Sequence, residues 1–590
     1  MAHSLLTPFV HRKPGAASRK LISAAEAIRL VTTGSCVHLA ATHSIPFGLA
    51  FELTRQFWGR RPGFELVTLG ASVNAQVMLR DPGFLRHIIT SYAGNVYPAP
   101  GPAAVFQDNY RTGAVPIENW SLCTLVQRLL AGALAVPFLP TRSLERSGLA
   151  EENAEATLAH VPNPFGEGEQ LVLRALTPDY TLVHGWAADS AGNVLARPPR
   201  TEGNYGALAA RKGVIASVDR IVGPAYIHAH SDDLLVPGSR VLAVVRLPYG
   251  AHPSPCRGIA PYRGYAEDDQ FLLDFRTASK DMTRLDAWIQ QWVLNVNHDQ
   301  YVAQLGTNRL RGLTERAAPD AWLGETRRRL KGIDFGAPPN PTEQMVVAMA
   351  QICAEQIRAR GYHTILAGQG TSNLAAWLAY YLLAKEGRDV DLMAEIGLYG
   401  YAPRPPQPLI FNFANIATCK GVGSALDVLG IHVTGAQRES CIGLLGAGLV
   451  DAYGNVDSTC IPDLKVWLLG SGGANDVLSG AAEVIVCCPQ DIRRLWRHVP
   501  YVTGPGDHVT TLVTTKGVFR RPSQSESFRL EAVLPPVDAP SQPLDAIVQE
   551  IRQSTGWDVC TAPTITRLTL PEQQTLRLLR LFDPDRHYLD

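Results

Sequence analysis

The stretch Asp-Ser-Ala-Gly-Asn-Val at residues 189–194 recurs in the second half of the chain as Asp-Ala-Tyr-Gly-Asn-Val at residues 451–456. Both copies follow an apolar run that contains glycine. Asp-x-x-Gly-Asn is typical of a tight turn, because Asp and Asn bond the local backbone and Gly adopts positive φ. Two generic domains could share such a turn by chance, so the elements around each copy decide the fold.

The elements around the two turns recur in the same order, which favours duplication. Each half carries a helix pattern, a short apolar strand, a loop, a second helix pattern and a second strand. In sequence order these are helix 24–31, strand 37–41, a helix from Pro46 and strand 64–69, then helix 345–358, strand 364–368, a helix from Ser372 and strand 390–394. Alternating helices and strands predict βαβ units and largely parallel sheets.

The chain has 590 residues, which is too long for one hydrophobic core. We predict an α/β fold of two duplicated open-sheet domains, at residues 1–313 and 341–590, packed across a cleft. Residues 314–340 are rich in charge and end in Gly-Ala-Pro-Pro-Asn, which predicts a linker. A helix is expected to begin near Thr342, which could cap it.

Composition excludes several classes of function. The 54 basic and 54 acidic residues leave no net charge to attract a polyanion, so nucleic acid is not an expected partner. None of the ten cysteines forms a C-x-x-C pair, so we expect no metal site and no redox dithiol. Without a signal peptide or a long apolar span, we predict a cytoplasmic protein that does not insert into a membrane.

Glu395 is the leading candidate for chemistry. It ends the apolar run at residues 390–394 and precedes Ile-Gly-Leu-Tyr-Gly. Open α/β sheets bind their ligands at the carboxyl ends of strands, and a carboxylate there loses solvent, so its surroundings must be built for it. On this segment alone, a structural acid or a cap on the following turn is the favoured explanation of Glu395.

Two glycine-containing loops follow predicted strands. Residues 470–476 read Gly-Ser-Gly-Gly-Ala-Asn-Asp after the strand 466–469, and residues 368–370 read Gly-Gln-Gly. Glycine lets the backbone approach a ligand and direct N–H groups at negative charge. Neither loop completes a P-loop or a dinucleotide motif, and either could be only a tight turn.

Taken together, these motifs resemble the class I CoA-transferases, specifically the glutaconate CoA-transferase branch, with an α-like and a β-like subunit fused in that order. The β-like motifs lie at residues 394–398, 451–459, 470–475, 501–503 and 516–518. The α-like motifs lie at residues 24–28, 137–140, 163–165, 248–254 and 305–310.

The resemblance implies an enzyme that moves CoA from an acyl-CoA to a carboxylic acid, with a dicarboxylate among the acids considered. It implies that Glu395 is the nucleophile and forms a glutamyl-CoA thioester in ping-pong catalysis. It also implies that the glycine loops supply oxyanion donors and CoA contacts, from Gly472, Gly473, Ala474, Asn475 and Gly370. CoA is then a substrate and no cofactor is needed. The resemblance also implies that copies of this chain associate into a homo-oligomer.

The first half departs from the family at its first loop. The α-type subunit usually carries Gly-Gly-Phe or similar after its first strand, whereas residues 40–44 here read Ala-Ala-Thr-His-Ser. Alanine adopts positive φ less readily than glycine, so we expect a different loop shape. The substrate pocket is predicted to include residues of this loop and of the next one, namely Thr42, Ser44, Ser72 and Asn74.

Four other functions stay open. Relatives on the same fold hydrolyse a C–C bond of a cyclic CoA thioester or decarboxylate glutaconyl-CoA. The decarboxylases resemble the transferases with cysteine in place of the glutamate, and this chain keeps Glu395. A thioesterase, which hydrolyses the CoA thioester, is the third possibility, and a non-catalytic acyl-CoA-binding protein is the fourth. A trapped glutamyl-CoA adduct is expected only for the transferase.

Overall fold

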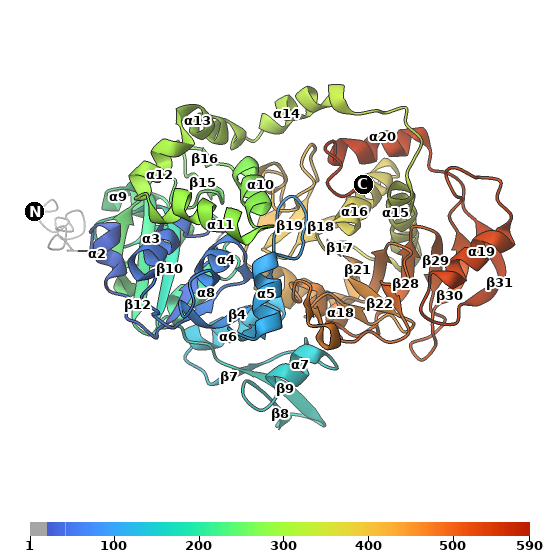
Figure 1. Cartoon of the computed structure of the whole chain (residues 1–590), viewed down its shortest axis with the longest axis horizontal. Helices are drawn as coiled ribbons and strands as arrows, with labels where there is room; N and C mark the ends of the chain where they lie inside the picture. The colour runs from blue at the N-terminus through green and yellow to red at the C-terminus, as the bar shows by residue number, and fades with distance from the viewer. Residues whose placement is uncertain (1–19, 42) are drawn as a thin grey trace, which may run out of the picture.

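A computed structural model describes residues 20–41 and 43–590. Its described part forms two α/β halves side by side, with the N-terminal half in blue and green and the C-terminal half in yellow and red (Figure 1). Each half is built around one large mixed sheet. The helices α13 and α14 pass across the top from one half to the other (Figure 1).

The first sheet has nine strands with β1 and β10 at its centre. β1 pairs in parallel with β2 and β10, and β10 pairs in parallel with β12. The strands are β1 (Cys36–Leu39), β2 (Phe64–Val67), β4 (Leu85–Thr90), β6 (Ile117–Asn119), β10 (Tyr180–Ala188), β11 (Val194–Leu195), β12 (Gly213–Ile221), β13 (Leu234–Val236) and β14 (Val241–Arg246).

The second sheet has ten strands and repeats the central pairings of the first. β17 pairs in parallel with β18 and β21, and β21 pairs in parallel with β26. The strands are β17 (Thr364–Ala367), β18 (Asp391–Ala394), β19 (Leu398–Tyr401), β20 (Gly421–Val422), β21 (Cys441–Gly446), β26 (Glu483–Cys488), β28 (Val509–Thr514), β29 (Gly517–Arg520), β30 (Arg529–Val533) and β31 (Cys560–Arg567).

The repeated turns confirm the predicted duplication. The carboxylate of Asp189 accepts from the backbone N–H of Asn193 at 2.9 Å and from its side-chain amide at 2.8 Å. Asp451 accepts from Asn455 in the same two ways, at 3.0 and 2.9 Å. The same turn therefore follows β10 in the first half and, in the second half, the short strand β22 (Leu449–Asp451), which comes directly after β21. The predicted fold of two duplicated open sheets is correct.

Helices cover both sheets. In the first half they are α2 (Ala24–Ile28), α3 (Phe47–Phe57), α4 (Val73–Leu79), α5 (Ala104–Thr112), α6 (Leu122–Ala133), α7 (Gly148–Asn153), α8 (Gly203–Ala209), α9 (Pro224–Ala229), α10 (Asp269–Ala278), α11 (Met282–Ile289), α12 (His298–Leu305) and α13 (Thr307–Arg316). From there on they are α14 (Ala321–Arg329), α15 (Pro341–Arg360), α16 (Thr371–Lys385), α17 (Phe413–Ile416), α18 (Ala474–Gly480), α19 (Leu544–Gln553) and α20 (Gln573–Phe582).

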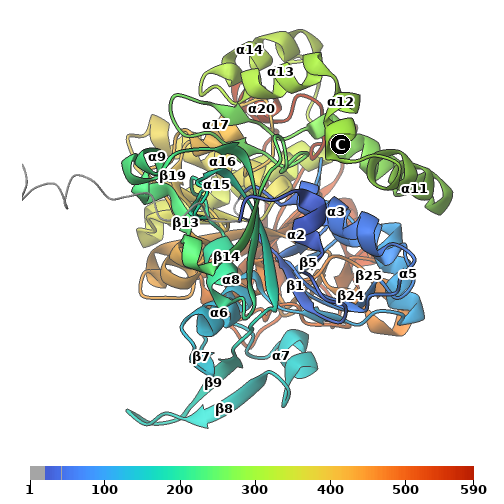
Figure 2. The same cartoon turned by 90° about the vertical axis from the view of Figure 1, so that its left-hand side faces the viewer.

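Small sheets decorate the two halves. The largest joins β7 (Phe138–Pro140), β8 (Leu158–Pro162) and β9 (Glu169–Arg174) and projects from the body in both views (Figure 2). The others join β3 (Gly70–Ala71) to β5 (Tyr92–Ala93), β15 (Cys256–Arg257) to β16 (Gly264–Tyr265), β24 (Cys460–Ile461) to β25 (Val466–Trp467), and β22 (Leu449–Asp451) to β23 (Val456–Asp457) and β27 (Leu495–Trp496).

The connection between the halves, predicted as a linker, contains a helix. α13 ends at Arg316, and α14 covers Ala321–Arg329 within the range 314–340. The next helix is capped by Asn340, whose side chain accepts from the backbone N–H of Glu343, so Thr342 lies inside the helix and is not its cap. The charge-rich composition belongs to an exposed helix, because a helix can keep one face in water.

One apolar cluster runs from one half into the other. Leu125 and Leu129 of α6 belong to the same cluster as Val477 and Leu478 of α18 and the π-helix Leu426–Val433. The four named side chains are at most 2% exposed. Because burial of apolar surface is the main stabilising force in folding, this cluster holds the two sheets at a fixed separation and so defines the cleft between them.

Candidate active site

Glu395 lies directly after the last residue of β18, at the carboxyl end of that strand, as predicted. The chain then turns through Gly397, which has φ +114°, and returns as the antiparallel strand β19. A Cβ on Gly397 would lie 2.6 Å from the carbonyl oxygen of Gly423. Only glycine fits this turn, so the turn holds the side chain of Glu395 at a defined place.

Glu395 lines a cavity of about 330 Å³ that the two halves share. The first half contributes Ala41, His43, Ile45, Leu69, Gly70, Ser91, Tyr92, Val96, Pro100, Leu122 and Thr201. The second half contributes Leu366, Ala367, Gly368, Gln369, Glu395, Ile396, Phe411, Leu445, Gly446, Ser458, Leu469, Gly470, Ser471, Gly472, Gly473, Ala474 and Val477. This volume falls within the usual range of small-molecule sites.

The loop 470–473 passes against the carboxylate of Glu395. A Cβ on Gly473 would lie 3.1 Å from Oε2 and 3.6 Å from Cδ of Glu395. Glycine therefore allows a close approach that a larger residue would disturb. The predicted meeting of Glu395 with Gly472, Gly473 and Ala474 is present in the structure, since all four line the same cavity.

The backbone donors of this loop differ in availability. The N–H of Gly472 donates to the carbonyl of Ser91 at 2.7 Å, and the N–H of Ala474 donates to Ser471 at 3.0 Å. Among the described residues, the N–H of Gly473 has no recorded acceptor. Of the three predicted backbone donors, Gly473 is therefore the one that can still bond a ligand oxygen.

Two acids shape the electrostatics, namely Glu395, which is partly exposed at the cavity wall, and Asp476, which is fully buried. Burial and, to a lesser extent, the charge of Asp476 raise the pKa of Glu395 from its usual 4.5 to about 7. No hydrogen bond or ion pair to its carboxylate is recorded within residues 20–41 and 43–590. A carboxylate that is largely desolvated and has no cation beside it is a costly feature in a fold, and such groups cluster at functional sites.

Asp476 is the partner that the motif analysis missed. Its carboxylate accepts from Ser121 Oγ at 2.6 Å, from Ser143 Oγ at 2.7 Å and from the N–H of Cys123 at 3.0 Å. These three donors come from the first half, and Cys123 lies in the first turn of α6. Burial raises the pKa of Asp476 to about 6, although the hydrogen bonds oppose this. The acidic position two residues after Ala474 was the available signal.

The other two loop residues of the prediction lie off the cavity wall. Asn475 is fully buried, accepts from the N–H of Leu144 at 2.9 Å and donates to the carbonyl of Thr503 at 2.9 Å. Its amide therefore fixes the loop to the first half. Gly370 begins α16, with φ +130°, and its N–H donates to Asn373 at 2.7 Å. Its neighbour Gln369 lines the cavity instead.

The predicted pocket residues of the first half are not brought to the site. Ser44 and Asn74 are buried, Ser72 is partly exposed, and none of the three lines the cavity. Thr42 lies outside the described residues. The loop nevertheless reaches the site through His43, which the prediction had not included and which lines the cavity.

His43 adopts a left-handed backbone conformation, with φ +62°, which the sequence analysis did not predict. Its Nε2 lies 3.0 Å from the carbonyl oxygen of Phe411 and donates to it. Burial lowers the pKa of His43 to about 4, so the ring is neutral at ordinary pH. His43 therefore closes the cavity between the halves without adding a charge.

A separate cluster brings together metal-ligand types, with His184, Asp219 and Cys256 all buried and their ligand atoms within 4.8 Å of one another. These groups bond to each other and to their neighbours. His184 Nε2 lies 2.9 Å from Asp219, and the other oxygen of Asp219 accepts from the N–H of Tyr249 at 2.7 Å. Protein hydrogen bonds alone account for their burial, so we assign the cluster to the fold.

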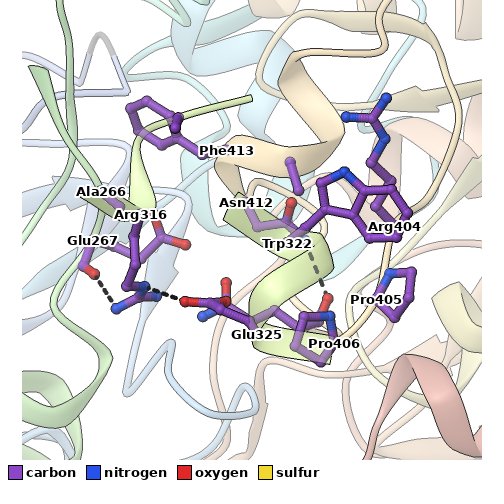
Figure 3. Close-up of a pocket in the computed structure, with 13 residues that line it drawn as sticks. Ala266, Glu267, Arg316, Trp322, Glu325, Arg404, Pro405, Pro406, Asn412 and Phe413 are labelled. Atoms are coloured by element: carbon purple, nitrogen blue, oxygen red, sulfur yellow. Dashed lines mark hydrogen bonds and ion pairs between the residues drawn. The ribbon is translucent and has the colours of Figure 1, made fainter. Parts of the chain in front are cut away.

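A second hollow lies where α13 and α14 meet the segment that carries Arg404, Pro405 and Pro406 (Figure 3). Its volume is about 20 Å³, enough for a water molecule and too small for a substrate. Arg316 pairs there with Glu325 at 3.0 Å, and burial raises the pKa of Glu267 to about 7. This hollow is therefore a small, polar part of the contact between the two halves.

Comparisons with known proteins agree with the predicted resemblance. A family model described as Coenzyme A transferase matches residues 21–247. One of the two subunits of glutaconate CoA-transferase from Acidaminococcus fermentans is 29% identical over 282 residues, which are 45% of this chain and 84% of that protein. The other subunit, from the same organism, is 24% identical over 278 residues, which are 43% of this chain and 97% of that protein.

The fold is also known from crystal structures. An acyl-CoA transferase of Escherichia coli O157:H7 aligns over 96% of this chain and 97% of its own, with a TM-score of 0.64 and 15% identity. The resemblance to glutaconate CoA-transferases, with regions like both subunits in one chain, is thus confirmed. The homologues indicate an enzyme that transfers CoA. No described helix is both long and apolar enough to cross a membrane.

Proposed function

We propose that this chain, similar to both subunits of a glutaconate CoA-transferase, is an acyl-CoA:carboxylate CoA-transferase with Glu395 as its nucleophile. One observation carries the proposal. The unpaired carboxylate of Glu395 lines a cavity shared by both halves, and the Gly473 residue packed against it keeps an unused N–H. A nucleophile beside an oxyanion donor is the arrangement that acyl transfer requires.

The first half-reaction takes two steps. The Glu395 carboxylate attacks the carbonyl carbon of the acyl-CoA, the C–S bond breaks, and CoA leaves as its thiolate from a mixed anhydride. The thiolate then attacks the glutamyl carbonyl carbon, and the original acid leaves as a carboxylate. The product is a glutamyl-CoA thioester on Glu395, and no electrons are exchanged with any other group.

The second half-reaction reverses these steps with a new acid. The acceptor carboxylate attacks the glutamyl thioester, CoA thiolate leaves, and a new mixed anhydride forms. The thiolate then attacks the acceptor's acyl carbonyl and restores the Glu395 carboxylate. Each attack places negative charge on a carbonyl oxygen, which the N–H of Gly473 can stabilise. Loss of one such donor typically costs about 3–4 kcal/mol of barrier.

The surroundings of Glu395 suit this sequence. Apolar side chains such as Leu122, Leu445 and Val477 line the cavity, and exclusion of water protects an anhydride from hydrolysis. The raised pKa of Glu395 makes its carboxylate more basic than an exposed one, and a desolvated carboxylate is a stronger nucleophile. The chemistry uses CoA as a substrate and calls for no metal or redox cofactor.

Trapping the covalent intermediate tests the proposal. The enzyme is mixed with an acyl-CoA in the absence of acceptor, reduced with borohydride or treated with hydroxylamine, and then mapped by peptide mass spectrometry. We expect the modification on Glu395 and its loss in Glu395→Ala. Turnover without any adduct would favour hydrolysis or decarboxylation on the same fold, and binding without turnover would favour an acyl-CoA-binding protein.

A further inference from the structure

The wall of the cavity around Glu395 carries no cation among the described residues. Its polar members are neutral at ordinary pH, apart from Glu395 itself. They are Ser91, Ser458, Ser471, Thr201, Tyr92, Gln369 and His43. A second carboxylate on a bound acid would therefore meet no lysine or arginine within this wall.

The two arginines whose charges act on residues of the wall each donate from Nη1 to backbone carbonyls. The charge of Arg276 opposes the rise in the pKa of Tyr92 that burial causes. Nη1 of Arg276 donates to the carbonyls of Tyr97 at 3.0 Å and Ala99 at 2.6 Å. The charge of Arg257 helps to lower the pKa of His43, and Arg257 donates to the carbonyl of Pro198. Neither guanidinium lines the cavity, so neither supplies the bidentate contact by which arginine recognises a carboxylate.

The interior of the cavity is instead aliphatic. Leu122, Leu366, Leu445 and Val477 line it, and each is at most 6% exposed. A second carboxylate buried among them would lose its water without gaining a partner. It would also be repelled by Glu395 and by Asp476 behind it. An alkyl chain would meet only favourable apolar contacts there.

We propose that the acid handled by this site is an aliphatic monocarboxylate, and that its acyl chain occupies the leucine-lined part of the cavity. This inference rests on the proposed transferase function and narrows it, because the resemblance alone left a dicarboxylate open. The absence of a cation makes the site selective by exclusion: desolvation of the second charge penalises a dicarboxylate, while its monocarboxylate counterpart binds.

Matched acceptor pairs test the inference. Hexanoate is compared with adipate, and valerate with glutarate, as acceptors for CoA from butyryl-CoA. We expect kcat/KM to favour the monocarboxylate of each pair at least ~100-fold, as an unpaired buried charge would impose. Equal rates within each pair would overturn this inference alone. Absence of transfer to all four acids, with no adduct on Glu395, would overturn the transferase proposal with it.

A cation introduced on the wall provides the second test. Val96 lines the cavity and is 36% exposed, so Val96→Lys places an ammonium at the site without burying it completely. We expect the preference for hexanoate over adipate to shrink by at least ~10-fold, through a new ion pair with the second carboxylate. Leu134→Lys, at a 57% exposed position off the cavity, should leave the preference unchanged. An unchanged preference in Val96→Lys would contradict the electrostatic argument.

Discussion

Glu395→Gln is expected to stabilise the protein at alkaline pH while abolishing CoA transfer. The substitution keeps the size of the side chain and removes its ability to ionise. In the folded chain, burial raises the pKa of Glu395 from 4.5 to about 7. Ionisation of the proposed nucleophile in a poorly solvated site thus lowers the free energy of unfolding. Such a loss of stability at a functional group is a common trade between stability and activity.

The sign of the effect follows from proton linkage. Between pH 4.5 and 7 the folded chain holds the Glu395 proton more tightly than the unfolded chain does. The free energy of unfolding therefore falls as pH rises through this window. The loss reaches about 3 kcal/mol at pH 8 and stays below ~1 kcal/mol at pH 5, since a tenfold change in acidity corresponds to about 1.4 kcal/mol.

Urea unfolding of wild type and Glu395→Gln at pH 5 and pH 8 measures this difference. We expect the variant to gain about 3 kcal/mol over wild type at pH 8 and little at pH 5. Asp457, Asp476 and Glu267 also have raised pKa values, but they are present in both proteins and largely cancel. Glu167→Gln, at an exposed position, is the matched control. Its free energy of unfolding relative to wild type should be the same at pH 5 and at pH 8. A variant no more stable than wild type at pH 8 would refute the reasoning.

Three further changes have defined outcomes. Gly473→Ala should lower kcat at least ~10-fold with the fold intact by circular dichroism, because the new Cβ would lie 3.1 Å from the Glu395 carboxylate; Gly312→Ala, where a Cβ meets nothing within 4 Å, should leave kcat unchanged. Asp476→Asn should move the acidic limb of the pH profile of kcat/KM to lower pH, since the Asp476 charge helps to raise the pKa of Glu395. An unchanged profile would contradict an electrostatic effect of Asp476 on Glu395. Glu343→Gln should cost about 3 kcal/mol in urea unfolding, because it leaves the buried guanidinium of Arg580 without its counter-ion, and a loss below ~1 kcal/mol would contradict this.

Local chemistry made part of this structure predictable. The Asp-x-x-Gly-Asn turns depend only on contacts within five residues, and both formed as expected. Glu395 could be placed at the end of a strand because an apolar run and a following glycine mark that position. Features that depend on neighbours in sequence, here strand ends and turns, carry their signal in the sequence itself.

Side-chain direction was not predictable in the same way. Ser44, Ser72 and Asn74 were chosen because they follow strands. The cavity is lined instead by His43 and Ile45, the two neighbours of Ser44 in its loop. Which neighbour points into a cleft depends on loop conformation, here the positive φ of His43. Asn475 is a similar case, since its amide is used by Leu144, more than 300 positions earlier. Partners so far apart in the chain leave no local signal.

The contacts of the glycine loop explain why two halves are needed to make one site. The proposed chemistry of Glu395 and Gly473 belongs to the second half, but the loop is held by the first. Gly472 donates to Ser91 and accepts from the N–H of Leu122 at 2.8 Å, and Asp476 accepts from three donors of the first half. A preorganised N–H stabilises an oxyanion only if it cannot rotate away. In the proposed reaction, the first half therefore contributes by immobilising the Gly473 donor. The covalent link between the halves keeps the effective concentration of the first half at this loop high.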